Sequence, residues 1–144
     1  MDRALTILFH VFYYYWYRRR YELGAGFRFN GYFIRMRGKG RIVAGKNCYV
    51  SYFSYLNIIS GTKLTLGENV SIAHNVRIYT SGFDVKEFLL SGTKIERNMD
   101  VYIGNNVLIG SNSFITPGTV IGDNCIVSAN TVVKGIHEGN QIIR

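Results

Sequence analysis

Residues that cross-link a small protein or hold a metal are scarce in this sequence. Its 144 residues contain two cysteines, Cys48 and Cys125, and this excludes a disulfide framework. The three histidines, His10, His74 and His137, are scattered along the chain. A zinc hydrase site would need three cooperating imidazoles, so we expect no metal site.

Long apolar runs are also missing. The longest one, residues 4–17, has about 14 residues, fewer than the roughly 20 that a membrane-spanning helix needs. It has no small-residue cleavage site of a signal peptide, and its positive charges, at residues 18–20, follow the apolar residues instead of preceding them. Because the cysteines also suggest a reducing compartment, we expect a cytoplasmic protein.

Acidic residues are scarce in the N-terminal third of the chain, where most basic residues lie. Residues 1–46 hold ten Lys or Arg and two acids, whereas the rest of the chain holds seven of each, so the net charge of +8 belongs to residues 1–46. Such an excess is either a solvated basic face or an attraction to anionic lipid or to a phosphate-bearing substrate. No nucleic-acid-binding motif accompanies it, so no nucleic-acid partner is expected.

The sequence does contain a repeat with a period of six. From Gly67 onward a small residue, any residue and an asparagine recur together, each time after an aliphatic residue. The triplets are Gly67-Glu68-Asn69, Ala73-His74-Asn75, Gly104-Asn105-Asn106, Gly110-Ser111-Asn112, Gly122-Asp123-Asn124 and Ser128-Ala129-Asn130, with Pro117-Gly118 in the remaining slot. This period fits neither strand alternation nor a helix, and it is typical of the hexapeptide repeat of a parallel β-helix.

Each hexad predicts one short strand and one corner. The aliphatic residue points into the prism, and asparagine suits the corner because it tolerates a positive φ angle. Three hexads make one turn, and each strand pairs with the strands of the turns above and below it. The residue two places before the aliphatic one should also point inward, which selects Val70, Val76, Val101, Val107, Ser113, Thr119, Cys125 and Thr131.

Residues 1–41 differ in character from this repeat. Sixteen of the 21 aromatic residues precede residue 56, and residues 4–17 are almost wholly apolar or aromatic. Two roles remain open for residues 4–20 and can coexist: a helix that caps the open first turn, or a peripheral contact with the inner face of the membrane. We therefore divide the chain into an N-terminal extension, residues 1–41, and a β-helix domain, residues 42–144.

The stretch from Ile103 to Asn124, IGNNVLIGSNSFITPGTVIGDN, resembles the hexapeptide-repeat acyltransferases, and among them the sugar O-acetyltransferases of surface-polysaccharide synthesis. The resemblance covers roughly residues 42–144. It implies an all-β, left-handed parallel β-helix with an N-terminal helical and aromatic extension. The handedness comes from the resemblance alone, because it is an exception to the right-handed crossover rule.

One segment, residues 80–100, breaks the repeat and predicts a loop that protrudes from a corner. In the family that this chain resembles, such a loop reaches the neighbouring subunit of a trimer and carries a histidine that acts as general base. This chain reads Ser81-Gly82-Phe83-Asp84, with phenylalanine in the place of that base. The remaining candidate bases are His74, at a corner of the repeat, and Asp84, whose pKa would have to be raised by burial.

The resemblance also implies residues that hold the pantetheine arm and the phosphates of coenzyme A. The matching positions are Gly110, Ser111, Ser128, Ala129, Thr131 and Lys134. For the small residues, plain β-helix structure is the simpler explanation.

Together these features predict a homotrimeric acyltransferase. It would transfer the acetyl group of acetyl-CoA to a hydroxyl of a free or lipid-linked saccharide. Phe83 supports an alternative, a catalytically degenerate relative that keeps the trimer and serves as a binding or structural protein.

Overall fold

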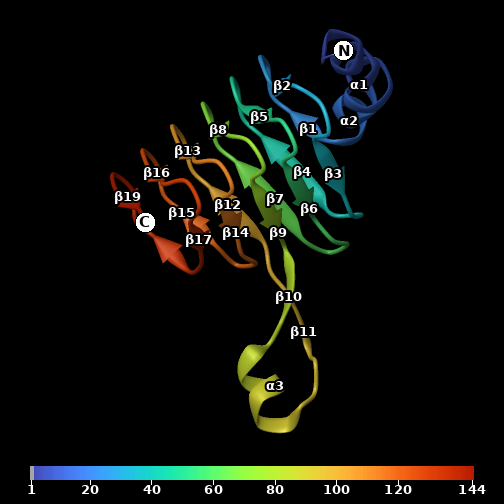
Figure 1. Cartoon of the computed structure of the whole chain (residues 1–144). Helices are drawn as coiled ribbons and strands as arrows, with labels where there is room; N and C mark the ends of the chain where they lie inside the picture. Colours follow the sequence, from blue (N-terminus) through green and yellow to red (C-terminus); the bar gives the residue numbers. More distant parts are fainter. Residues whose placement is uncertain (1) are drawn as a thin grey trace.

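The computed structural model describes residues 2–144 and shows a prism with three parallel sheets as its faces (Figure 1). In the first sheet the order is β1 (Glu22–Leu23), β4 (Arg41–Ala44), β7 (Lys63–Leu66), β12 (Val101–Ile103), β15 (Val120–Ile121) and β18 (Ile136–His137). In the second sheet it is β2 (Arg28–Asn30), β5 (Tyr49–Ser51), β8 (Ser71–Ile72), β13 (Leu108–Ile109), β16 (Ile126–Val127) and β19 (Ile142–Ile143). In the third sheet it is β3 (Arg35–Arg37), β6 (Tyr55–Asn57), β9 (Arg77–Tyr79), β14 (Phe114–Ile115) and β17 (Val132–Val133).

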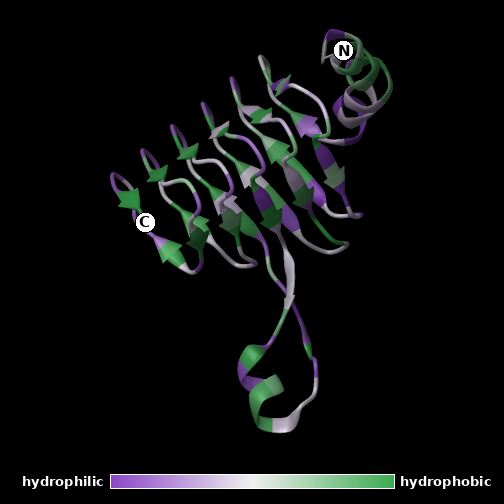
Figure 2. Ribbon diagram, viewed as in Figure 1, coloured by the Kyte–Doolittle hydropathy of each residue, from purple (hydrophilic) through white to green (hydrophobic). Residues whose placement is uncertain are grey.

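The chain visits the three sheets in rotation, so that every strand of the prism except those at its two ends pairs with strands one turn before and one turn after it. Ile103, for example, pairs with Leu66 on one side and Ile121 on the other. This is the left-handed parallel β-helix that the repeat and the resemblance predicted. All eight residues that we expected to point inward at the small or β-branched position are buried, and apolar strands run the length of the prism (Figure 2).

The geometry of the corners explains the regular spacing of asparagine in this chain. Asn69, Asn106 and Asn124 have φ angles of 56°, 55° and 57°, in the left-handed region. Stacked one above another, they also bond to each other: Nδ2 of Asn69 donates to Oδ1 of Asn106 at 3.0 Å, and Asn106 donates to Asn124 at 3.1 Å. The same side chain thus allows the turn and links successive turns.

The prism begins earlier than residue 42, where we had placed the boundary. Strands β1, β2 and β3 pair in parallel with β4, β5 and β6, so residues 22–37 form the first turn. The asparagine signal is missing here because glycine and phenylalanine occupy the corners. Gly38, with a φ of 91°, shows why: a Cβ there would lie 2.0 Å from the carbonyl oxygen of Ile58.

Residues 2–20 form a helical segment that covers the open first turn (Figure 1). It consists of α1 (Asp2–Phe9), a π-helical turn η1 (His10–Tyr14) and α2 (Tyr15–Arg20). Tyr14 is buried, stacks on Phe29 at 4.4 Å, and its hydroxyl donates to the carbonyl of Gly31 at 2.8 Å. The hydroxyl of Tyr17 accepts from the amide of Met36 at 3.2 Å. The segment therefore closes the end of the core.

We expect the Tyr14 hydroxyl to stabilise this cap. Tyr14→Phe leaves the buried carbonyl of Gly31 without its donor, which should lower the free energy of unfolding by about 1–3 kcal/mol. Tyr15→Phe, at an exposed position of the same segment, is the matched control and should change it by less than about 0.5 kcal/mol. Urea denaturation of the two variants measures the difference, and equal effects would contradict the assignment.

Candidate functional site

The segment that breaks the repeat forms an arm that leaves the prism between the third and first sheets (Figure 1). Strands β10 (Ser81–Phe83) and β11 (Glu96–Asn98) pair antiparallel, and α3 (Val85–Ser91) lies beyond them. The protruding loop expected at residues 80–100 is therefore confirmed, and it has a regular structure of its own.

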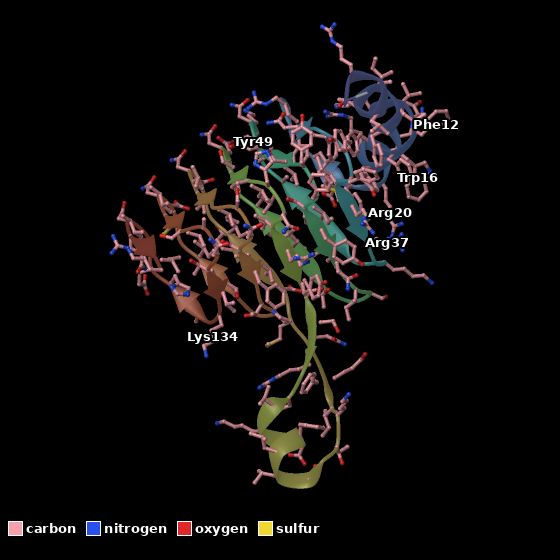
Figure 3. All side chains as sticks on the ribbon, in the orientation of Figure 1. Phe12, Trp16, Arg20, Arg37, Tyr49 and Lys134 are labelled. Atoms are coloured by element: carbon pink, nitrogen blue, oxygen red, sulfur yellow. The ribbon has the colours of Figure 1, made fainter. Side chains whose placement is uncertain are left out.

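A cleft of about 520 Å³ lies between the base of this arm and the corners of the next two turns. Its apolar part comes from Phe83, Val85, Met99 and Pro117, and its charged part from Asp84, Lys86, Arg97 and Lys134. Figure 3 shows Lys134 on the lower edge of the prism, the same edge from which the arm projects. An apolar slot with three cations suits a ligand that has an uncharged chain and phosphate groups.

Asp84 does not meet the condition that we set for a general base. Its Oδ1 accepts from the amides of Lys86 and Glu87 at 3.0 and 3.1 Å, as the N-cap of α3, and its Oδ2 lies 3.2 Å from Nη1 of Arg97. The bond from the Glu87 amide, with the nearby Arg97 charge, holds the pKa of Asp84 below its usual range. We predicted that burial would have to raise this pKa, and the structure shows the opposite shift.

Phe83 lines the cleft at the place where the resemblance led us to look for a histidine. The residue is 47% exposed, and its ring meets Phe88 edge-on, with 5.7 Å between ring centroids. The side chain can therefore contact a ligand in the cleft, but it has no group that could accept a proton.

His74 lies at a different corner of the prism. It follows β8 and precedes β9, so it sits between the second and third sheets, whereas the arm follows β9. The imidazole is exposed and stacks on Tyr52, with 5.4 Å between centroids and 7° between ring planes. A single chain therefore does not bring His74 to Phe83 and Asp84.

The six positions matched to coenzyme A binding separate in the same way. Gly110, Ser111, Ser128 and Ala129 lie at or beside the corner of His74, one and two turns further along, whereas Lys134 lines the cleft. Thr131 is buried, and its hydroxyl is directed to the carbonyl of Ala129 at 3.4 Å, so its side chain points away from any ligand outside the prism. The roles of these residues stay predictions.

An aromatic column above His74 was missed by the sequence reasoning. Tyr32 meets Tyr52 edge-on at 5.0 Å, and Tyr52 stacks on His74. Beside them Phe33 stacks on Phe53 at 5.8 Å, and both have positive φ angles, 56° and 62°. The signal was available in the sequence: Tyr-Phe occurs twice in the slots that His74-Asn75 fills in the next turn.

Among residues 2–144 there is no group of three His, Cys, Asp or Glu side chains placed to hold a metal ion.

Comparison with known proteins identifies the family. Residues 100–134 match the family described as hexapeptide repeat of succinyl-transferase. The chain is 37% identical over 89 residues to galactoside O-acetyltransferase of Escherichia coli, which is 62% of this chain and 42% of that protein. It is 31% identical over 128 residues to the putative lipopolysaccharide biosynthesis O-acetyl transferase WbbJ of the same organism, covering 83% of this chain and 62% of that one.

Comparison with solved structures gives the same family of proteins. Galactoside acetyltransferase in complex with coenzyme A superposes with a TM-score of 0.62 at 29% identity, over 84% of this chain and 58% of that chain. A hexapeptide-repeat acetyltransferase of Vibrio cholerae complexed with acetyl coenzyme A has a TM-score of 0.64 at 22% identity, over 93% and 68%, which supports the fold. The chain belongs to the hexapeptide-repeat acyltransferase family. It spans about half the length of the curated relatives that it matches.

The Asp84 cap makes the arm sensitive to acid. Because its pKa is lowered in the folded state, the carboxylate stabilises α3 above the usual carboxyl pKa of about 3.9, and this stabilisation is lost as pH falls through the lowered value. We expect Asp84→Ala to loosen α3 already at neutral pH, whereas Asp123→Ala, at a corner of the prism, should not. NMR chemical shifts of residues 85–91 report the helix, and shifts that stay constant down to pH 2 in the unmutated protein would refute the assignment.

Proposed function

We propose that this chain forms the catalytic β-helix of an acetyl-CoA-dependent O-acetyltransferase that acts on a saccharide. The observation that carries the proposal is the cleft beside the arm, because it combines an apolar wall with Lys86, Arg97 and Lys134. The identity to proteins named as O-acetyltransferases supports the same chemistry.

The cleft suits the donor in two parts. Phe83, Val85 and Met99 offer apolar contact for the pantetheine arm, and the cations at its edge offer partners for phosphate groups. Arg97 is already paired with Asp84, so Lys134, which is exposed and makes no ion pair within residues 2–144, is the better phosphate ligand.

The reaction needs a base that this cleft does not contain. In acetyl transfer the acceptor hydroxyl attacks the thioester carbonyl, its proton passes to a base, and coenzyme A leaves as the thiol once the tetrahedral intermediate collapses. We assign the base to His74 of a second copy. In a homotrimer the arm of one copy would face the corner between the second and third sheets of the next copy, where His74 lies.

The surface around that corner supports an assembly of this kind. On the second sheet Leu108, Ile126 and Ile142 stand in register and are 44%, 47% and 54% exposed. On the third sheet Phe114 and Val132 stand in register beside them. Exposed ladders of apolar side chains are more stable when a partner covers them.

The aromatic column favours a saccharide as the acceptor. Tyr32, Tyr52 and the imidazole of His74 form a line along one edge of the prism, and Phe53 beside them is half exposed. Flat aromatic faces pack against the apolar faces of sugar rings while the hydroxyls stay free. A sugar on this column would present a hydroxyl next to His74.

We expect His74→Ala to lower the rate of acetyl transfer at least about a hundredfold, because loss of a general base typically costs 10² to 10⁴ in rate. Binding of coenzyme A, measured by calorimetry, should not change. His137→Ala, near the far end of the prism, is the matched control and should keep the rate. Acetyl-CoA consumption with a panel of saccharides is the assay, and a fully active His74→Ala enzyme would eliminate His74 as the base.

A shared site predicts complementation between inactive variants. Mixing His74→Ala with a variant whose residues 85–95 are replaced by a short glycine linker should restore up to about a quarter of the wild-type sites, since each site takes one part from each copy. Light scattering should give the mass of three 16.4 kDa chains. A monomeric protein, or no recovery in mixed oligomers refolded together, would rule out a site between copies.

Phe83 favours the second candidate function, a binding or structural relative that has lost its base. Phe83→His distinguishes the two. If the unmutated protein turns over no saccharide and Phe83→His does, the cleft is complete and the natural chain is a binding protein. If the unmutated protein is active and His74→Ala is not, the enzyme uses the base from the neighbouring copy.

A further inference from the structure

The outer face of the N-terminal helical segment is largely apolar. A face in contact with water alone would be expected to carry polar residues. One face of the segment packs on the prism through Tyr14 and Tyr17. The remaining surface exposes between 49% and 67% of each of seven large apolar or aromatic residues, namely Ile7, Leu8, Val11, Phe12, Tyr13, Tyr15 and Trp16. Phe12 and Trp16 point away from the prism in Figure 3. An exposed apolar face on a helix is more stable when an apolar environment covers it.

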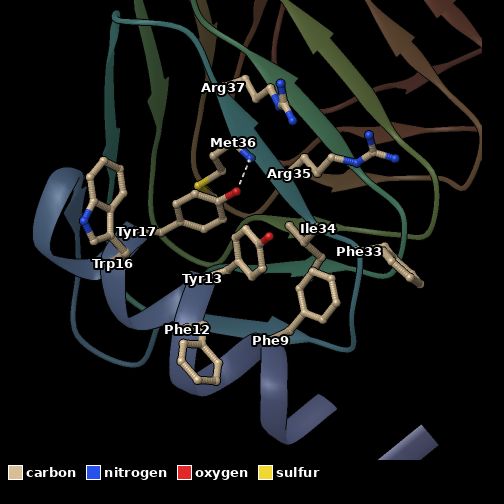
Figure 4. A pocket seen from close by; sticks show the side chains of 10 residues that line it. All are labelled: Phe9, Phe12, Tyr13, Trp16, Tyr17, Phe33, Ile34, Arg35, Met36 and Arg37. Atoms are coloured by element: carbon tan, nitrogen blue, oxygen red, sulfur yellow. Dashed lines mark hydrogen bonds between the residues drawn. The ribbon is translucent and has the colours of Figure 1, made fainter. Parts of the chain in front are cut away.

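A groove of about 610 Å³ runs between this segment and β3. Phe9, Phe12, Tyr13 and Trp16 line it on the helical side, and residues 33–37 line it on the side of the prism. Figure 4 shows Arg35 and Arg37 across the groove from Phe12. The groove is therefore apolar along one wall and basic along the other, which matches a molecule with an apolar chain and an anionic head.

The basic residues at this end are mostly uncompensated. The two ion pairs found within residues 2–144, Arg41 with Glu22 and Arg97 with Asp84, do not include Arg35 or Arg37. Two other arginines serve the fold: Arg18 donates to the carbonyl of Phe27 and Arg20 to that of Gly38. Together with Arg19, which lies over the ring of Tyr15, they place a belt of cations beside the exposed aromatic residues.

We propose that residues 4–20 dock on an anionic phospholipid bilayer, and that the groove takes one acyl chain of an anionic lipid while its phosphate meets Arg35 and Arg37. Aromatic residues next to arginines are suited to the boundary between acyl chains and head groups. No helix within residues 2–144 has the length and apolarity to cross a bilayer. The groove lies at the N-terminal end of the prism, whereas the cleft proposed to bind the acetyl donor lies beside the arm (Figure 1). This inference is therefore independent of the proposed enzyme activity.

Trp16 provides a direct readout, because it is the single tryptophan of the chain and lines the groove. Full-length protein is titrated with vesicles of phosphatidylcholine, with and without phosphatidylglycerol. We expect a blue shift of Trp16 emission with the anionic vesicles only, weakened by added salt. Phosphatidylglycerol brominated on its acyl chains should quench the emission, since the indole would lie beside the chains.

Matched variants separate the charge from the apolar surface. Arg35→Gln with Arg37→Gln should weaken vesicle binding at least about tenfold, whereas Lys94→Gln with Arg144→Gln, which removes the same charge from exposed positions elsewhere, should weaken it much less. Phe12→Ser should also weaken binding about tenfold, and Leu90→Ser, an exposed apolar residue in the arm, should not.

Three outcomes would overturn the proposal. The first is no shift and no quenching of Trp16 with anionic vesicles at low salt. The second is the same response to inorganic phosphate without lipid, which would make the groove an anion site that needs no chain. The third is self-association in the absence of lipid that Phe12→Ser abolishes while vesicle binding is absent, which would make the surface a contact between two copies. If the charge variants and their controls bind vesicles equally well, Arg35 and Arg37 do not contact the lipid phosphate and the proposal is contradicted.

Discussion

Pairing between successive turns is the interaction on which the rest of this structure depends. Each strand gives its hydrogen bonds to the turn before and the turn after, so every turn must place its strands at the same positions. An insertion within a strand would break two pairings, whereas an insertion at a corner breaks none. This is why the arm at residues 80–100 leaves the prism at a corner and returns to it with the register intact, from β9 to β12.

The same regularity places the candidate functional side chains on two different edges of the prism. Side chains at one corner stack in a column, so the aromatic rings, His74, Ser111 and Ala129 share one edge, and the arm, Pro117 and Lys134 share another. A rigid prism cannot fold one edge onto another. Chemistry that needs groups from two edges would therefore call for a second copy of the chain and not for motion within one chain.

The sequence allows the prism from Leu66 onward to be predicted almost residue by residue, because the inward residues and the corner asparagines follow a strict spacing. The first turn could not be predicted in this way. Its corners use Gly38, Phe33 and other residues that meet the same backbone demand without asparagine. Asp84 shows a second limit: whether a carboxylate is a base or a helix cap depends on Lys86, Glu87 and Arg97 around it, and only the folded arm brings Arg97 to it.

The stacking of turns also gives the molecule a built-in scale of length. Neighbouring strands in a sheet lie about 4.8 Å apart, so Tyr32 and His74, two turns apart in one column, differ by about 10 Å along the prism axis. For a molecule that rests on a surface by its N-terminal end, the prism fixes how high His74 stands above that surface. For a glycan held upright on that surface, the number of turns between the cap and His74 would then set which sugar unit stands level with the imidazole.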